Sequence, residues 1–198
     1  MNPFLPVEVQ SSLVLASASP RRREILEGLG FEFEVIPAKL DEEQELSDDP
    51  ETNAKLIAEL KGVGAQRVRP RKTILAADTI VTYGERVFGK PKDPGDVFDM
   101  LRSLSGREHL VMTAMALIAP PNKRLVEAES TRVFFREISD DEIARYLDTS
   151  EPFGKAGAYA IQGFASAFVD RIEGCYFNVV GLPVALLFRM FRELERMG

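Results

Sequence analysis

The chain has few of the residues that build metal and nucleophilic sites. Its 198 residues include one cysteine, Cys175, and one histidine, His109. One cysteine excludes an internal disulfide, and one cysteine with one histidine falls short of the ligand set of a zinc site. No nucleophile for His109 can be identified, so we expect His109 and Cys175 to be structural. A reducing, cytoplasmic location is the expectation for such a chain.

Long apolar runs and an excess of positive charge are also missing. No run approaches the ~20 residues of a transmembrane helix. Residues 13–18 carry small side chains like those of a signal-peptide cleavage site, but Glu8 precedes them and the apolar stretch is short. The net charge of -6 and the pI near 5.0 argue against broad binding to nucleic acid or anionic membrane. We therefore expect neither partner.

The composition is that of an ordinary globular protein, with 45% hydrophobic and 28% charged residues. Strand and helix patterns mix without strict alternation, which predicts an α/β (α+β mixed) fold with a mixed sheet flanked by helices. We expect one domain over 1–198, with residues 1–11 as a loose N-terminal extension. Predicted strands cover 12–16, 33–36, 73–78, 108–120 and 123–135, and predicted helices cover 19–29, 52–68, 93–104, 139–148 and 183–197. Hairpins are predicted around residues 84–85 and 174.

Asp78 is the first candidate functional residue. The apolar run 74–77 ends in this carboxylate, and Thr79 follows it. Apolar neighbours on both sides predict that Asp78 is near the core, where a carboxylate is usually paired, metal-bound or catalytic. The end of a strand is also where ligands collect in open α/β sheets. The alternative is an aspartate that only caps the next turn.

Three arginines, residues 21–23, crowd the first turn of the first predicted helix, where the helix dipole disfavours cations. Arg22 shares a helical stripe with Leu26 and therefore faces inward, whereas Arg23 can pair with Glu27. An inward arginine at a helix N-terminus favours a bound anion. The alternative is a solvated basic turn.

Other polar residues complete this set. The acidic run 41–43 is either solvated surface or a ligand set for a hard divalent cation. Lys61 lies near an apolar helical stripe and can reach a cleft. Gln162 ends a Gly/Ala-rich segment, 154–163, and its amide could pair with a pyrimidine edge. Together with Lys90, these acids and bases suit metal-assisted attack of water on a phosphoanhydride. No Walker A or G-x-G-x-x-G motif is present.

Several segments occur in order, at matching intervals, between residues 13 and 183. They are LASASPRR at 15–22, ADT at 77–79, GKP at 89–91, LSG at 104–106, KAGAYAIQG at 155–163 and VGLP at 180–183. These segments resemble the Maf family of nucleoside triphosphate pyrophosphatases. The resemblance implies cleavage of a nucleoside triphosphate to the monophosphate and pyrophosphate with Mg²⁺ or Mn²⁺. It also implies an inosine-triphosphatase-like fold with two lobes around a cleft, a cytoplasmic location and a homodimer.

The ADT and IQG forms resemble the branch of the family that acts on dTTP and UTP. Modified pyrimidine nucleotides are further possible substrates of such an enzyme. By this resemblance, Asp78 is the general base or a metal ligand, and Glu42 is a second metal-side acid that Asp41 or Glu43 could replace. The remaining implied roles are catalytic for Lys90 and Arg22, and substrate-binding or specificity-determining for Ser17, Arg21, Lys61, Thr79 and Gln162. Lys61 is followed by Gly62, where the family usually has alanine. An alternative function is a septation-linked regulatory protein that acts by binding.

Overall fold

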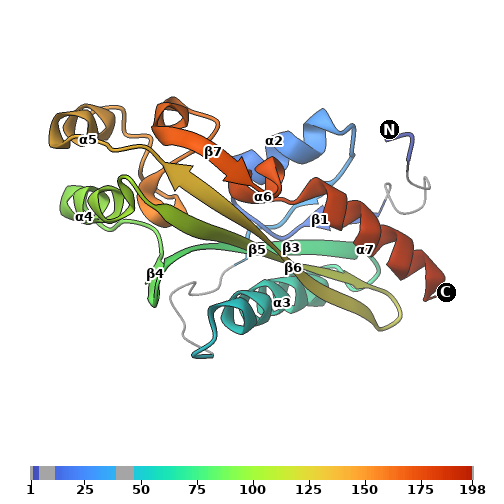
Figure 1. The fold of residues 1–198 in the computed structure, drawn as a ribbon. Coiled ribbons are helices and arrows are strands. Elements are labelled where there is room, and N and C mark those ends of the chain that lie inside the picture. The colour runs from blue at the N-terminus through green and yellow to red at the C-terminus, as the bar shows by residue number, and fades with distance from the viewer. Residues whose placement is uncertain (1, 5–11, 39–46, 198) are drawn as a thin grey trace. The chain divides into compact units, whose positions relative to one another are not determined.

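The computed structural model describes residues 2–4, 12–38 and 47–197, which are drawn in colour in Figure 1. The chain divides into two compact units. The first unit comprises residues 1–78, 113–129 and 181–198, and the second comprises residues 79–112 and 130–180. The chain therefore enters each unit more than once, and each unit is built from segments that are distant in sequence.

The described strands form one mixed sheet. They are β1 (Leu13–Leu15), β2 (Glu34–Val35), β3 (Thr73–Tyr83), β4 (Arg86–Phe88), β5 (Glu108–Ala119), β6 (Lys123–Phe135) and β7 (Val169–Glu173). The order is β2-β1-β3-β5-β6-β7, with β4 paired to β3. Strand β1 pairs in parallel with β2 and β3, whereas the pairs β3–β4 and β6–β7 are antiparallel. The predicted mixed sheet is confirmed.

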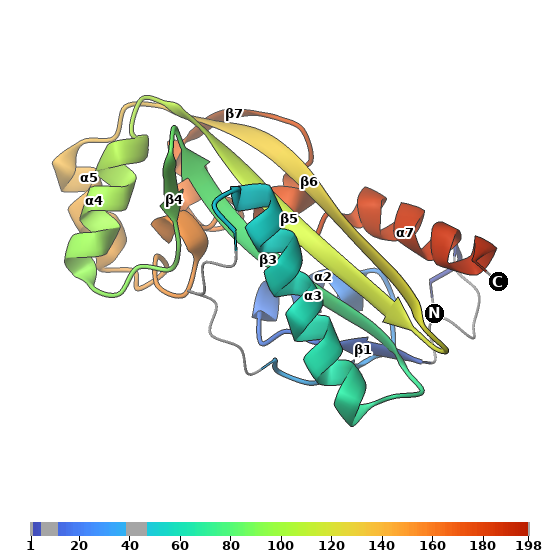
Figure 2. The ribbon, with the colours of Figure 1, turned by 90° about the horizontal axis from the view of Figure 1, so that it is seen from below.

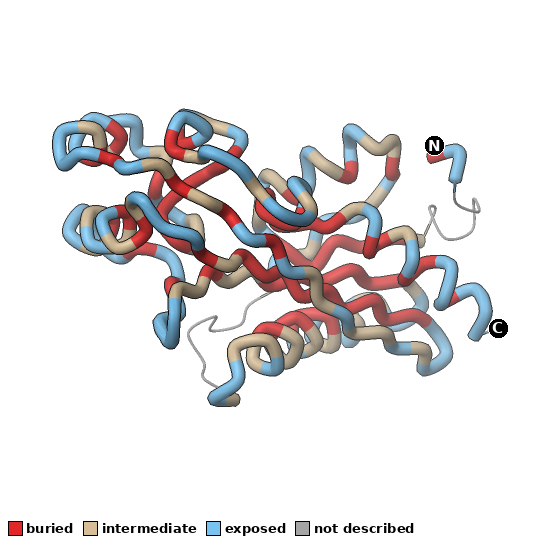
Figure 3. The backbone as a smooth tube through the Cα atoms, viewed as in Figure 1, coloured by how far each residue is buried: buried red, intermediate tan, exposed pale blue. Residues whose placement is uncertain are grey.

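Three helices cover the strands of the first unit. They are α2 (Pro20–Gly28), α3 (Pro50–Val68) and α7 (Val184–Arg196). Helix α3 lies on one face of these strands, and α2 and α7 lie on the other face (Figures 1 and 2). The core of this unit includes Leu15, Leu26, Leu75, Leu117 and Phe191, which are fully buried. Buried residues are accordingly concentrated along the strands and on the inner sides of the helices (Figure 3).

The start of α3 differs from the prediction by two residues. The Asp49 side chain accepts a hydrogen bond from the backbone N–H of Thr52, and Pro50 occupies the first helical turn. This cap satisfies an N–H group that has no acceptor inside the helix. The predicted helix begins at Thr52, because the apolar periodicity starts there and the capping residues lie ahead of it.

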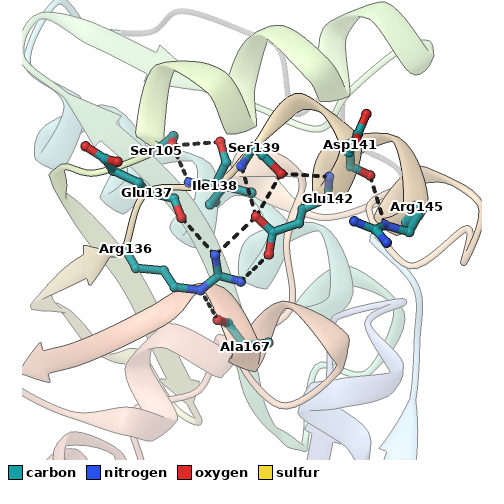
Figure 4. A network of polar contacts seen from close by, with 9 residues as sticks. All are labelled: Ser105, Arg136, Glu137, Ile138, Ser139, Asp141, Glu142, Arg145 and Ala167. Atoms are coloured by element: carbon teal, nitrogen blue, oxygen red, sulfur yellow. Dashed lines mark hydrogen bonds and ion pairs between the residues drawn. The ribbon is translucent and has the colours of Figure 1, made fainter.

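The second unit contains α4 (Pro94–Leu104), α5 (Asp140–Leu147), α6 (Tyr176–Val180) and two 3₁₀ turns, η1 (Ala156–Ala158) and η2 (Phe164–Phe168). Helices α4 and α5 lie against each other. Ser139 and Glu142 form the predicted capping box at the start of α5, and the Glu142 carboxylate also accepts from Arg136 at 2.7 Å (Figure 4). These hydrogen bonds, of which the bond from Arg136 has the largest effect, lower the pKa of Glu142 to about 2.

Two predictions of strand structure are wrong. Strand β3 continues through Asp78 to Tyr83, because the residues after Asp78 are β-branched or aromatic and pair with β4. Asp78 therefore lies within a strand and not at its end. The predicted hairpin around Gly174 is also absent from the described residues, since Tyr176–Val180 forms α6. The buried Asn178 amide donates to the carbonyl of Val111 and the hydroxyl of Thr131, and these tertiary bonds outweigh the β-propensity of the segment.

The predicted N-terminal extension is described only in part, since residues 1 and 5–11 lie outside the described residues. Asn2 is buried, and its side-chain amide donates to the carbonyl of Leu29 at 2.9 Å. The ring of Phe4 meets the edge of Phe188 with centroids 6.3 Å apart. Among the described residues, no helix is both long enough and apolar enough to cross a membrane.

His109 lies in a buried aromatic cluster of the second unit, with the rings of Phe135 and Tyr159 at its edges. Its Nε2 atom is 2.8 Å from the Tyr159 hydroxyl, and its Nδ1 atom has no hydrogen-bond partner among the described residues. Burial lowers the pKa of His109 to about 4, so the ring is neutral in the folded protein at pH 7. The expectation of a structural histidine agrees with this environment.

This environment predicts a pH-dependent stability. Between pH 6.5 and 4.5 the unfolded chain binds a proton at His109 and the folded chain does not, so the free energy of unfolding falls as pH falls, by up to about 2 kcal/mol. The lowered pKa of Glu142 adds a loss of the same sign, but mainly below pH 4.5, where more than half of the unfolded chains carry a proton on this carboxylate. Urea denaturation at several pH values should show that His109→Gln removes most of the slope between pH 6.5 and 4.5. An unchanged slope would contradict the assignment.

Candidate active site

Arg22 links three segments of the first unit. Its Nε atom donates to the carbonyl of Gly181 at 2.8 Å, and its Nη1 atom donates to the carbonyl of Ala77 at 2.8 Å and to Ser17 Oγ at 3.0 Å. Arg22 and Ser17 are both buried, as the helical spacing predicts for Arg22. The rigid fork of donors in a guanidinium suits this bridging role. The chain therefore places a permanent cation beside β3, one residue before Asp78.

Asp78 forms a buried ion pair with Lys61. The Nζ atom of Lys61 lies 2.8 Å from Oδ1 of Asp78, and the side chains are 4% and 12% exposed. An unpaired charge at such depth is costly, so each group compensates the burial of the other. Lys61 reaches β3 from α3, whereas Arg22 reaches it from α2 on the opposite face (Figure 1). Ser17, Arg22, Lys61 and Asp78 are thus brought together around the end of the Ala76-Ala77-Asp78 segment.

Gly62 explains how α3 comes close enough for this pair. A Cβ atom at Gly62 would lie 2.8 Å from Cδ1 of Ile118 on β5. The missing side chain therefore lets the helix backbone pack closely over the strands of the first unit. Although the usual alanine is absent after Lys61, Lys61 contacts the predicted carboxylate.

The other predicted residues have different places. Arg21 is half-buried in the first turn of α2, beside Arg22. Arg23 is exposed and pairs with Glu27 at 2.7 Å, as predicted. The second unit holds Thr79, half-buried on β3, together with Lys90 and Gln162, which are exposed.

The Gly/Ala-rich segment approaches its neighbours closely within the second unit. The backbone N–H of Gly157 donates to the carbonyl of Gly89 at 3.1 Å, which brings this segment beside the residue that precedes Lys90. Gly157 has a φ of 70°, and a Cβ atom there would lie 3.0 Å from Cγ2 of Val81. Both facts require glycine, so the prediction of close backbone approach is confirmed.

The predicted metal ligands can be compared with the structure only in part. Glu42, with its possible substitutes Asp41 and Glu43, lies outside the described residues. Within the described residues, no group of three or more histidine, cysteine, aspartate or glutamate side chains forms a metal-binding cluster. Asp78 supplies one carboxylate, and a magnesium-like ion is commonly held by one or two carboxylates together with substrate phosphates and water.

Sequence reasoning missed two kinds of groups. The carbonyls of Ala77 and Gly181 accept from Arg22, but backbone acceptors leave no signal in the residue types. Glu151 was also missed, although its carboxylate accepts from the backbone N–H groups of Phe164 and Ala165. Glu151 lies between α5 and the Gly/Ala-rich segment, where no periodic pattern assigns it a face.

The sequence is similar to those of several known proteins. A family model described as a Maf-like protein matches residues 12–194. A dTTP/UTP pyrophosphatase of Alkaliphilus oremlandii is 48% identical over 184 residues, covering 91% of this chain and 95% of that protein. The dTTP/UTP pyrophosphatase of Carboxydothermus hydrogenoformans is 46% identical over 182 residues, covering 91% and 97%.

A solved structure of the Staphylococcus aureus Ham1 protein covers 91% of this chain and 98% of its own, with a TM-score of 0.48 and 15% identity.

We predict that Arg22→Lys destabilises the protein by about 2 kcal/mol or more, because a lysine cannot serve three buried acceptors in fixed directions. Arg23→Lys is the matched control, since Arg23 is the exposed neighbour in the same helical turn. Urea denaturation of both variants measures the difference. Equal stabilities of the two variants would show that the Arg22 bridge is not needed for the fold.

We also predict that Lys61→Met lowers the free energy of unfolding by about 3 kcal/mol, because Asp78 then loses its counter-charge inside the protein. Lys55→Met serves as control on the same helix, where Lys55 pairs with Glu51 at 2.6 Å in a more exposed position. That change should cost less than about 0.5 kcal/mol. A loss at Lys61 as small as the loss at Lys55 would contradict a coupled buried pair.

Proposed function

The chain belongs to the Maf family, and we propose that it is a nucleoside triphosphate pyrophosphatase acting on dTTP and UTP. In this proposal, water cleaves the anhydride between the α and β phosphates and releases the nucleoside monophosphate and pyrophosphate. The observation that carries the proposal is the buried Lys61–Asp78 pair beside the Arg22 bridge. The names of relatives at 45–48% identity support the choice of substrate.

The chemistry asks for positive charge near the phosphates and a carboxylate near the attacking water. A triphosphate gathers negative charge in the transition state, and fixed cations stabilise that charge better than water does. We assign this role to Arg22, Lys61 and Lys90, with Ser17 and Arg21 as further phosphate ligands. Because Arg22 is held in place by protein acceptors, its charge needs little reorganisation when substrate binds.

Asp78 is assigned either to proton transfer or to metal binding. One oxygen of its carboxylate accepts from Lys61, and a carboxylate has about four acceptor positions in all. As a general base, Asp78 takes the proton that the attacking water loses. As a metal ligand, it holds Mg²⁺ or Mn²⁺ with an acid of the 41–43 run, Glu42 first. Such an ion neutralises phosphate charge and lowers the pKa of bound water.

Base recognition is assigned to Gln162 and Thr79 of the second unit. The Gln162 amide presents a donor and an acceptor side by side, which can pair with one carbonyl oxygen and the N3–H group of a thymine or uracil edge. Thr79 adds a hydroxyl. A site that hydrogen-bonds its base discriminates against bases with other edges, since polar groups that lose water on binding are then left unpaired. Modified pyrimidines that keep this edge are predicted substrates as well.

A homodimer and a cytoplasmic location stay predictions, and sedimentation can test the homodimer.

The alternative function, a regulatory protein that acts only by binding, is not favoured, because the similar proteins carry the names of pyrophosphatases.

The test is pyrophosphate release from a panel of nucleoside triphosphates with Mg²⁺ or Mn²⁺. We expect dTTP and UTP to be the best substrates, and Asp78→Asn to lower kcat by about 100-fold or more. In this variant Lys61 lacks its carboxylate partner, which destabilises the fold. The assay temperature is therefore kept below the unfolding midpoint of the variant. Asp99→Asn, an exposed aspartate on α4, is the control and should keep full activity.

Three results would contradict the proposal. The first is full activity in the folded Asp78→Asn variant. The second is release of orthophosphate with a nucleoside diphosphate, which would mean that another bond breaks. The third is a clear preference for purine nucleotides.

A further inference from the structure

The Glu151 carboxylate holds the turn that follows Gln162. Its Oε2 atom accepts from the backbone N–H of Phe164 at 3.0 Å, and its Oε1 atom accepts from the N–H of Ala165 at 3.2 Å. The Tyr146 hydroxyl donates to Oε1 at 2.9 Å. Hydrogen bonds to an ionised acceptor are about twice as strong as neutral ones. One side chain thus satisfies the first two N–H groups of η2.

Gly163 is shaped to this carboxylate. A Cβ atom at Gly163 would lie 2.0 Å from Oε2 of Glu151, so the carboxylate occupies the place where a side chain would be. The φ of Gly163 is -110°, a value that any residue adopts. Glycine is therefore needed here because of Glu151 and not because of the backbone conformation.

Glu151 is itself held firmly. Lys155 Nζ donates to the carbonyl of Glu151 at 2.5 Å, and the ring of Tyr146 packs on Phe168 at 5.2 Å between centroids. Ser150, just before Glu151, has a φ of 58°, which a non-glycine residue adopts only when its surroundings enforce it. The segment after α5 is therefore held in place, and Glu151 can fix the turn at Phe164 and Ala165 from it.

We propose that Glu151 is a positioning residue for base selection. It rests on the proposed function, in which Gln162 hydrogen-bonds the pyrimidine. Gln162 is exposed and directly precedes Gly163, so the bonds from Glu151 fix the backbone that carries its amide. A hydrogen-bonding group discriminates between bases only when it is held to within about 0.5 Å. The Glu151 carboxylate bonds to the turn that carries Gln162 and is not among the residues assigned to the phosphates, so we expect it to affect binding and selectivity more than the chemical step.

The test is Glu151→Gln, which places an NH₂ donor against a backbone N–H donor. We expect the KM for dTTP and UTP to rise about tenfold with kcat within about threefold, and the preference for dTTP over dCTP to fall about tenfold. Asp141→Asn on α5 removes the same charge from an exposed position and is the control. Tyr146→Phe, which removes one bond to Glu151, should give a smaller shift of the same kind and covers the case in which Glu151→Gln does not fold.

A double-mutant cycle tests the contact directly. Gly163→Ala should reproduce the loss of selectivity, because the new Cβ atom displaces the carboxylate. In a Glu151→Ala background, the same Gly163→Ala change should add little. Additive effects of the two changes would overturn the proposal. Unchanged KM and selectivity in Glu151→Gln would overturn it too, as would a proportional loss of activity toward every nucleotide.

Amide hydrogen exchange separates this inference from the proposed function. If the unmodified protein hydrolyses no nucleoside triphosphate, the proposed function fails, and the exchange of the Phe164 and Ala165 amides still decides the role of Glu151. Exchange at least tenfold faster in Glu151→Gln, and unchanged in Asp141→Asn, supports control of the turn by Glu151. Equal exchange in all three proteins overturns it.

Discussion

The buried ion pair between Lys61 and Asp78 is the constraint on which the rest of the first unit depends. Two charges removed from water persist only when they stay together, so α3 must lie where its lysine can reach β3. Gly62 allows the close packing that this requires. Arg22 then adds a second cation, bound to the carbonyl just before Asp78. The first unit can therefore hold several charges close together, because ion pairing, hydrogen bonds and packing offset the cost of burying them.

The second unit uses carboxylates differently, to hold backbone. Glu142 caps α5 and binds Arg136, while Glu151 binds two N–H groups of the turn after Gln162 (Figure 4 shows the Glu142 network). In each case an acid compensates amides that helical geometry leaves without acceptors. Glu142 lies in the first turn of α5, and Glu151 lies shortly after the last turn. Glu142 therefore ties the helix to Arg136, which follows β6, and Glu151 ties the segment after the helix to the turn at Phe164 and Ala165. The proposed recognition of a nucleobase by Gln162 needs such rigidity, because selectivity depends on the direction of a hydrogen bond as well as on contact.

Sequence reasoning succeeded where a local rule acts alone. Helical spacing predicted that Arg22 faces inward, and apolar neighbours predicted that Asp78 is buried. The Ser139–Glu142 pattern predicted the start of α5. It failed where a distant partner decided the outcome. Strand β3 continues past Asp78 because β4 pairs with it, and the segment after Cys175 is helical because Asn178 binds Thr131 and Val111. Glu42 lies outside the residues that the structure describes, so its role stays a prediction.

The sequence by itself determined the mixed α/β class, the family, the spacing of the motifs and the types of residue in the candidate site. These follow from periodicity and from short segments, which depend only on neighbours along the chain. Only the tertiary structure decided which groups touch: that Lys61 pairs with Asp78, that Arg22 binds the carbonyls of Ala77 and Gly181, and that Glu151 occupies the space left by Gly163. Such contacts join residues up to 159 positions apart. Their distances are set by how helices and strands pack, which no local pattern encodes.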